Sequence, residues 1–286
     1  MSFTLLRAIL IGTALLVVVE NSGAVRVAPQ EDAAAQRMEA RKWLNEGVQA
    51  YREGQIDQAI VDFQNAKQLD PSLVNAQLYL ATARSAQYIP GDPSPENAQH
   101  GDQALQEFRS ILGAHPDNLS AIDGAGSILY NLAGTPFDPE KMEESKSYHQ
   151  KHIELRPGDP EPYYWVGVID WSLAFRGNGD MRADFNKIVK KPVKNTDPTP
   201  PALAAQFRQK YGGIVDEGIA NMNKAMDLRP DYDDAMAYLN LLYRQKADME
   251  LTVAEQELDV KIADDLVHQV KAIKKRKMST SQSPPP

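Results

Sequence analysis

The sequence predicts an all-α protein built from antiparallel helix pairs that stack side by side. Three observations carry this prediction. In the stretch 43–71, small residues stand at fixed offsets from large apolar ones, as closely approaching helices require. A tripeptide ending in proline recurs along the chain, each time before a new helical segment. Over 254–277, apolar residues return every three or four positions, which is the spacing of one helix face.

The first helix pair is predicted within residues 43–71. Its first helix carries an aromatic residue and then a glycine, and its second helix carries alanine, an aromatic residue, alanine and proline. The residues on these places are Trp43, Gly47, Ala59, Phe63, Ala66 and Pro71, with Gly54 in the turn. On these residues the segment resembles a tetratricopeptide repeat, which implies an antiparallel helix pair. We expect Gly47 and Ala59 to face each other across this pair.

The same pattern returns three more times. The tripeptides LDP, AHP, LRP and LRP end at Pro71, Pro116, Pro157 and Pro230, and small residues recur at Ala81, Gly126 and Gly167. The prolines are 45, 41 and 73 residues apart, against a family period of about 34 residues. The residues in excess of this period, here called the surplus, fit between the two helices of a repeat, at 88–101, 134–141 and 174–213. We therefore expect a solenoid of about five helix pairs over residues 31–277, with a charged insertion at about 174–213.

The C-terminal end of this solenoid is predicted to be closed by a capping helix. A first helix should run from Pro230 to about Glu250, and a second over 254–277. The apolar face of the second consists of Leu258, Ile262, Leu266, Val270 and Ile273, whereas acids such as Asp259 occupy the other side. The end of a solenoid requires such a cap. Residues 278–286 contain too few apolar side chains to fold, which predicts a disordered tail.

The N-terminus has the three parts of a secretory signal peptide. Arg7 supplies the positive charge, residues 8–19 form an apolar run, and Ser22 and Ala24 are the small residues before a cleavage point. Twelve helical residues rise only about 18 Å, less than the roughly 30 Å of a hydrocarbon core. Residues 1–24 are therefore predicted to be a cleaved signal peptide. The alternatives are an uncleaved membrane anchor and a buried helix. Cleavage or anchoring would place the protein outside the cytoplasm, as a periplasmic, secreted or anchored protein.

The sequence shows no catalytic constellation. It lacks the nucleophile elbow, the phosphate-binding loop and the zinc-protease motif, and it contains no cysteine. His149 and His152 share a helix face and are the one candidate pair of metal ligands, but they fall where the third repeat needs packing residues. We therefore predict no catalytic residue, no metal site, no cofactor and no enzymatic activity.

The charge distribution separates the insertion from the rest of the chain. The formal net charge of −8 disfavours nucleic acid as a partner. Residues 176–210 are nevertheless basic, and their lysines are Lys187, Lys190, Lys191, Lys194 and Lys210. We expect two short helices there, the second ending at Gly212. The first four of these lysines are candidates for contact with an acidic partner or an anionic membrane surface. The alternative is a solvated insertion.

The resemblance also implies a binding groove. In tetratricopeptide solenoids the first helices of the repeats line a concave surface. The residues of this sequence on the corresponding places are Leu44, Val48, Tyr51, Leu78, Tyr130, Tyr164, Val168 and Trp171. Leu44 and Val48 stand where carboxylate-clamping members carry lysine and asparagine, so that clamp is not supported. An apolar, aromatic groove suits an extended or helical partner segment. The alternative is that these side chains pack between repeats.

Together these features predict an exported, non-enzymatic scaffold that binds a protein or peptide partner in the groove of the solenoid. One alternative is a membrane-tethered assembly factor that uses the N-terminus or the basic patches. Another is a ligand-binding or enzymatic module built on 174–213. The partner's identity and the oligomeric state are left open by the sequence.

Overall fold

A computed structural model of the chain describes residues 29–194 and 197–281, and in these residues it contains ten α-helices and no β-strand. The predicted signal peptide, residues 1–24, lies outside the described residues. Among the described helices, none combines the length and the apolar character that crossing a membrane would demand.

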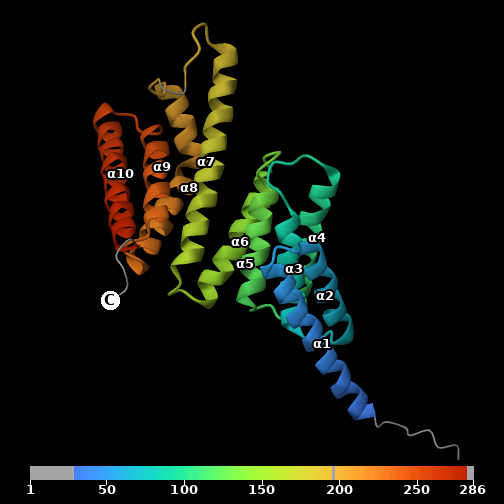
Figure 1. Cartoon of the computed structure of the whole chain (residues 1–286). Coiled ribbons are helices and arrows are strands. Elements are labelled where there is room, and N and C mark those ends of the chain that lie inside the picture. Colours follow the sequence, from blue (N-terminus) through green and yellow to red (C-terminus); the bar gives the residue numbers. More distant parts are fainter. Residues whose placement is uncertain (1–28, 195–196, 282–286) are drawn as a thin grey trace, which may run out of the picture.

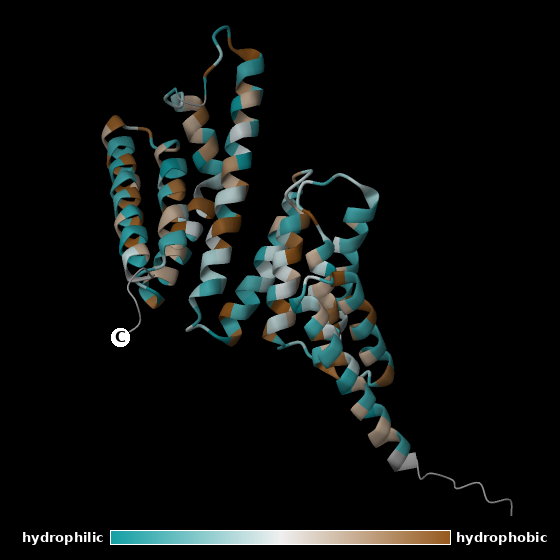
Figure 2. Cartoon of the chain, in the orientation of Figure 1, coloured by the Kyte–Doolittle hydropathy of each residue, from teal (hydrophilic) through white to brown (hydrophobic). Residues whose placement is uncertain are grey.

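The helices form five consecutive antiparallel pairs, which confirms the predicted all-α solenoid (Figure 1). Their bounds are α1 (Pro29–Arg52), α2 (Ile56–Leu69), α3 (Val74–Gln87), α4 (Pro95–Ala114), α5 (Leu119–Leu132), α6 (Pro139–Leu155), α7 (Pro160–Ile188), α8 (Pro201–Leu228), α9 (Asp233–Ala247) and α10 (Val253–Ser281). Each helix packs on the next one along the chain. Figure 2 shows polar and apolar residues alternating along the helices, as amphipathic helices require.

Glycine permits the close approach within the first pair. A Cβ atom added to Gly47 would lie 2.6 Å from the ring carbons of Phe63, and only 3.2 Å from the Cβ of Asp62. The Phe63 ring of the second helix therefore fills the space beside Gly47. Ala59, Phe63 and Ala66 are fully buried. That Gly47 also faces Ala59 stays a prediction.

The same close approach at a glycine recurs in the third and fourth repeats, as the sequence predicts. A Cβ on Gly126 of α5 would lie 2.8 Å from Nε2 of His149 on α6, and a Cβ on Gly167 of α7 would lie 2.7 Å from the terminal methyl of Met222 on α8. In each repeat, a glycine of the first helix therefore accommodates a large side chain of the second.

The stretch 174–213 does not form a pair of separate short helices. Residues 174–188 belong to α7 and 201–213 to α8, with a loop between them; the two helices contain 29 and 28 residues and run side by side as one long hairpin. Gly177 makes room for the Tyr211 ring, and Ala174 and Phe207 are fully buried between the helices. Gly212 does not end the second helix. The surplus residues lengthen both helices because small and large side chains continue to match across them.

A buried arginine fastens the far half of this hairpin to α9. Arg182, which is 5% exposed, donates hydrogen bonds to Asn178, to Asp248 at 3.1 Å and to the hydroxyl of Thr199. Its Nη1 also reaches the carbonyl oxygen of Lys194 at 3.4 Å. The loop between α7 and α8 is thereby held against the fifth repeat.

The capping helix differs from the prediction at both of its ends. Ile262, Val270 and Ile273 pack against the core and Leu266 is buried, as expected. Leu258, however, is 59% exposed whereas Asp259 is buried. Both residues line a groove between the first turns of α10 and α8. At the other end α10 continues to Ser281, so residues 278–281 are helical and not part of a disordered tail, and 282–286 lie outside the described residues.

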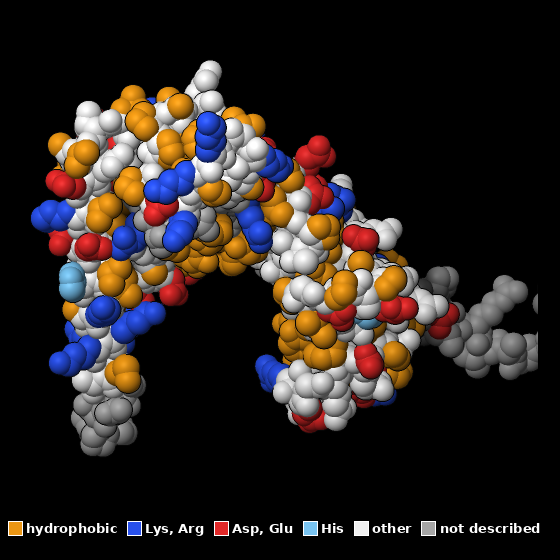
Figure 3. Space-filling model, turned by 90° about the horizontal axis from the view of Figure 1, so that it is seen from above, with side chains coloured by type: hydrophobic (Ala, Val, Ile, Leu, Met, Phe, Trp, Pro, Cys, Tyr) orange, Lys and Arg blue, Asp and Glu red, His pale blue; other side chains and the backbone are white. Residues whose placement is uncertain are grey.

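The stacking of the first helices loosens in the middle of the chain. α1 packs on α3, α3 on α5, and α7 on α9, whereas α5 and α7 make hardly any direct contact. The space-filling view shows an arch with hydrophobic side chains gathered under its top and on the inner side of its right limb (Figure 3). The loosened stacking between α5 and α7 is where the candidate site lies.

Candidate partner-binding cleft

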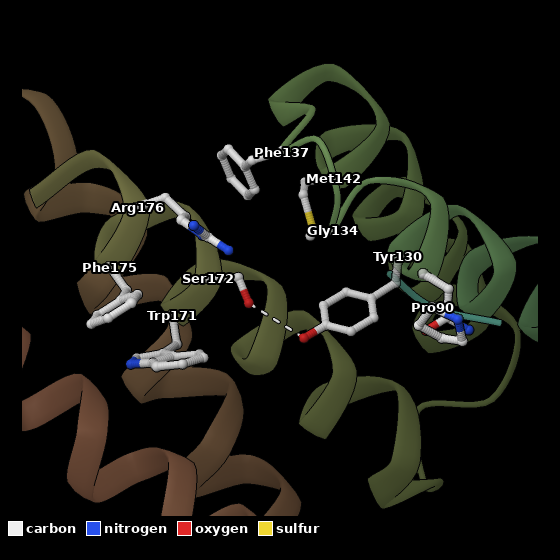
Figure 4. Close-up of a pocket in the computed structure, with 10 residues that line it drawn as sticks. Pro90, Tyr130, Gly134, Phe137, Met142, Trp171, Ser172, Phe175 and Arg176 are labelled. Atoms are coloured by element: carbon white, nitrogen blue, oxygen red, sulfur yellow. Dashed lines mark hydrogen bonds between the residues drawn. The ribbon is translucent and has the colours of Figure 1, made fainter. Parts of the chain in front are cut away.

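A cleft of about 250 Å³ lies between the end of α5, the loop that follows it and the middle of α7 (Figure 4). Its lining is mostly aromatic and apolar, with one arginine: Pro90, Tyr130, Asn131, Gly134, Phe137, Met142, Trp171, Ser172, Phe175 and Arg176. The long first helix of the fourth repeat supplies one wall, and the residues around the 134–141 surplus supply the other.

The α7 wall of the cleft presents an aromatic stack to solvent. The rings of Trp171 and Phe175, one helical turn apart, stack with centroids 5.1 Å apart. Phe175 is 50% exposed although it is large and apolar. Trp171 is also held edge-on by Tyr238 of α9 at 5.4 Å. The stack is thus a rigid apolar platform whose outer ring has no partner covering it.

A cation stands at the mouth of the cleft. The guanidinium of Arg176 lies over the Phe137 ring at 5.5 Å from its centroid. No carboxylate of the described residues forms an ion pair with Arg176. An arginine over an aromatic ring keeps its charge available for a carboxylate. The cleft can therefore hold a large apolar side chain and a neighbouring negative charge together.

The floor of the cleft is fixed by Tyr130. Its hydroxyl lies 3.5 Å from Oγ of Ser172, which in turn donates to the carbonyl oxygen of Val168. The Tyr130 ring contacts Trp165 edge-on at 5.5 Å, and Trp165 contacts Tyr164 at 5.6 Å. Burial, together with the nearby Tyr238, raises the pKa of Tyr164. A continuous aromatic cluster thus joins α5 to α7, which make hardly any direct contact, and extends to Tyr238 of α9.

A buried ion cluster sets the position of α7 behind the cleft. Nζ of Lys146 on α6 lies 2.7 Å from Oδ1 of Asp170 on α7 and 2.7 Å from Oε2 of Glu217 on α8. Asp170 is completely buried, and burial raises its pKa to about 7 even though Lys146 opposes the shift. Three helices therefore meet at one charged contact directly before Trp171. Sequence reasoning missed this cluster, because carboxylates and lysines at these separations carry no local signal.

Comparison with known proteins bears on the fold. No protein-family model and no curated protein matches the sequence. Among solved structures, a MamA RS-1 double mutant aligns with a TM-score of 0.54 at 15% identity, covering 84% of this chain and 97% of that one. Another MamA structure aligns at 0.54 with 13% identity over 87% and 98% of the two chains. MamA from Desulfovibrio magneticus RS-1, from residue 41 to its end, aligns at 0.53 with 15% identity over 86% and 98%.

This chain has a tetratricopeptide-repeat fold. The fold rests on the five helix pairs, the small residues at their close approaches and the alignment over most of each chain. At these identities the likeness concerns the fold alone.

The tetratricopeptide fold brings three of the eight predicted groove residues together. Tyr130 and Trp171 line the cleft, and Tyr164 belongs to the aromatic cluster beside it. Val168 is 1% exposed in the core between α7 and its neighbours, so it offers no surface to a partner, and its place in the predicted groove is wrong.

The remaining groove residues are half-buried in the packing of the first two repeats. Leu44, Val48 and Tyr51 pack around the core of the first pair, and Leu78 packs in the second. Tyr51 packs against the core of the first pair, whereas Tyr164 and Trp171 pack against the core of the fourth and fifth pairs. A single concave surface shared by these three side chains stays a prediction.

Several lining residues were missed from the sequence. Phe137 comes from the 134–141 surplus and Met142 directly follows it, whereas Phe175 and Arg176 come from the stretch assigned to the insertion. One signal was available: Phe175 follows Trp171 by one helical turn, and Arg176 comes directly after it.

The basic residues of the predicted insertion lie away from the cleft. Lys187 is exposed and pairs with Asp184 at 2.7 Å, and Lys190, Lys191 and Lys194 are exposed in the segment after α7. Ile188, where α7 ends, is about 18 Å along the helix from Arg176. The tip of the hairpin, 187–194, is thus a second charged surface and no part of the aromatic cleft.

The two histidines are packing residues. His149 is 1% exposed and stacks on Trp165 at 5.6 Å, and burial, followed by the nearby His152, lowers its pKa to about 4. Nδ1 of His152 lies 2.6 Å from Asp123. In the described part of the chain, no three histidine or acidic side chains come together as metal ligands would.

Proposed function

We propose that this protein is an exported tetratricopeptide scaffold that binds a protein or peptide partner and catalyses no reaction of its own. The observation that carries the proposal is the uncovered Trp171–Phe175 stack beside the unpaired Arg176 guanidinium. A single exposed apolar residue is ordinary, but a rigid aromatic pair in a cleft has the composition of a binding hot spot.

The cleft defines the chemistry of the partner segment. Its volume of about 250 Å³ accommodates one large apolar side chain rather than a whole helix. Arg176 would pair with a carboxylate one or two positions along the partner, where a bidentate contact adds specificity. The hydrophobic side chains on the inner side of the arch offer further apolar surface (Figure 3).

The proposal is tested by affinity capture from the extracytoplasmic fraction, followed by binding measurements with the captured partner. Trp171→Ala and Phe175→Ala should each weaken binding by about 1–3 kcal/mol, because aromatic anchors dominate such interfaces. Ile188→Ala is the matched control, since Ile188 is an 83% exposed apolar residue of the same helix outside the cleft. Equal binding by the wild type and the Trp171, Phe175 double variant, with unchanged helical content, would exclude the cleft.

Export is tested separately by the intact mass of the protein purified from its source. The three-part pattern of residues 1–24 supports a mature chain that begins after Ala24. A full-length species attached to membranes would favour the tethered assembly factor, and a full-length species in the cytoplasm would contradict both.

A further inference from the structure

Two consecutive glycines interrupt the middle of α8 without a packing reason. A Cβ on Gly213 would meet nothing within 4 Å, and one on Gly212 would meet only Cγ of Arg208 at 3.6 Å. By contrast, Gly177 faces Tyr211 and Gly218 faces Leu242 at 3.0 Å. Glycine is among the least favourable residues inside a helix, so an open pair calls for another explanation.

These glycines border a groove of about 580 Å³ between α8, α10 and the end of α9. Four carboxylates line it, Asp216, Glu250, Glu255 and Asp259, with Arg208 and Lys246 as the only cations in its lining. It shares no lining residue with the aromatic cleft. The groove is thus a separate surface with an excess of negative charge.

Most of these charges already have partners within the chain. Arg208 forms an ion pair with Glu250, and Glu255 accepts a hydrogen bond from the hydroxyl of Thr252 at 2.6 Å. The Lys246 ammonium stands over the Tyr243 ring at 6.0 Å from its centroid. No cation of the described residues therefore forms an ion pair with Asp216 or Asp259.

Asp259 is the exceptional member of the group. It is 6% exposed, and no described residue gives it a hydrogen bond or an ion pair. Burial raises its pKa, Lys246 opposes this, and the like charges of Glu250, Glu255 and Asp216 add to it. Its oxygens are not among the fully buried atoms that lack a hydrogen-bond partner, so the carboxylate is open to the groove and can accept a cation from outside.

We propose that this groove binds an arginine side chain presented by a partner protein, as a docking site separate from the aromatic cleft. The guanidinium would pair with Asp259 and the nearby Asp216, since its planar fork matches carboxylates in a bidentate way. Leu258, 59% exposed at the edge, offers an apolar contact for the stem of the arginine. The missing side chains of Gly212 and Gly213 let the partner backbone approach α8 closely.

The test uses the full mature chain and a defined probe, the peptide acetyl-Leu-Arg-Leu-amide, followed by ¹H–¹⁵N NMR. The amide signals of Gly212 and Gly213 should shift in a saturable way, and the affinity should fall as salt rises. The analogue with citrulline in place of arginine has nearly the same shape and no charge, and it should produce no such shift. Equal shifts with both peptides, or no saturable shift, would overturn the proposal.

Two variants locate the site on the chain. Asp259→Asn removes the buried charge with little change in size, and Gly213→Leu fills the groove. Each variant should lower the affinity for the arginine peptide by about tenfold or more. The controls are Asp117→Asn and Gly113→Leu, which alter an exposed carboxylate and an exposed helical glycine with no neighbour within 4 Å. Undiminished binding by folded Asp259→Asn would overturn the assignment.

Discussion

The ammonium of Lys146 and the carboxylate of Asp170 meet at 2.7 Å in a site where both side chains are at most 8% exposed. The contact joins α6 to α7, and Glu217 of α8 adds a second acceptor at 2.7 Å. Oδ2 of Asp170 has no hydrogen-bond partner. The orientation of α7, which carries half of the aromatic cleft, thus depends on a buried pair that its surroundings only partly satisfy.

Removal of one partner should therefore be costly. Lys146→Met leaves Asp170 buried without a counter-charge, and the free energy of unfolding should fall by about 3–5 kcal/mol. Urea unfolding followed by circular dichroism measures the effect. Lys151→Met, on the exposed side of the same helix, should change stability by less than about 1 kcal/mol. Equal stabilities of the two variants would show that the pair does not hold α7 in place.

His149 should make the fold sensitive to acid. Its pKa is about 4 in the folded protein against 6.5 for the free side chain, so the unfolded chain binds a proton first as pH falls. The stability contributed by neutral His149 is full above pH 6.5 and is lost as pH falls toward 4, on the order of 3 kcal/mol in total.

A measurement of stability against pH must separate the effect of His149 from that of Asp170, which also titrates with a shifted pKa. The raised pKa of Asp170 has the opposite sign, because its stabilising contribution is present at low pH and is lost as pH rises toward about 7. Urea unfolding of the wild type and of His149→Leu at several pH values between 4 and 7.5 isolates the histidine. The wild type should lose more stability than the variant on acidification, and parallel curves would contradict the prediction.

Packing of the first pair should be intolerant of added volume. Ala59→Leu should destabilise the protein by about 1–3 kcal/mol, since Ala59 is fully buried. Gly47→Ala should also destabilise, because its new methyl group meets the Phe63 ring at 2.6 Å, even though alanine favours helices by about 1 kcal/mol.

Two comparisons test this packing. Gly113→Ala, at an exposed helical glycine, should raise the melting temperature. Phe63→Leu should recover part of the loss in Gly47→Ala, and a purely additive double variant would show that the two residues do not interact.

The basic hairpin tip and the aromatic cleft should respond differently to salt. If the tip contacts an acidic partner or membrane, replacing Lys187, Lys190, Lys191 and Lys194 by glutamine should weaken binding at low salt and have little effect near 1 M, where the Debye length is about 3 Å. The loss of binding caused by Trp171→Ala should persist at both salt concentrations. Co-sedimentation with vesicles of anionic and of neutral lipids separates the membrane from the protein partner. Unchanged binding by the quadruple variant at low salt would leave the tip as a solvated loop.

The sequence by itself determined the helix pairs. Small residues such as Gly126 and Gly167, and the prolines before each new helix, are local signals of close approach and of helix ends, and they predicted five pairs and a capping helix correctly. The repeat pattern also pointed to Tyr130 and Trp171, because the place of a residue within a tetratricopeptide repeat implies the direction of its side chain.

Only the tertiary structure decided where the regular superhelix breaks and what gathers there. Three features depend on how repeats pack across long separations in sequence. They are the loosened contact between α5 and α7, the contact of the Arg176 guanidinium with the Phe137 ring at the cleft, and the burial of Val168. Surplus residues in a repeat can form a loop or lengthen two helices, and the choice rests on matched surfaces such as Gly177 against Tyr211. Local periodicity is the same in both cases, so the difference becomes visible only when the facing helix is in place.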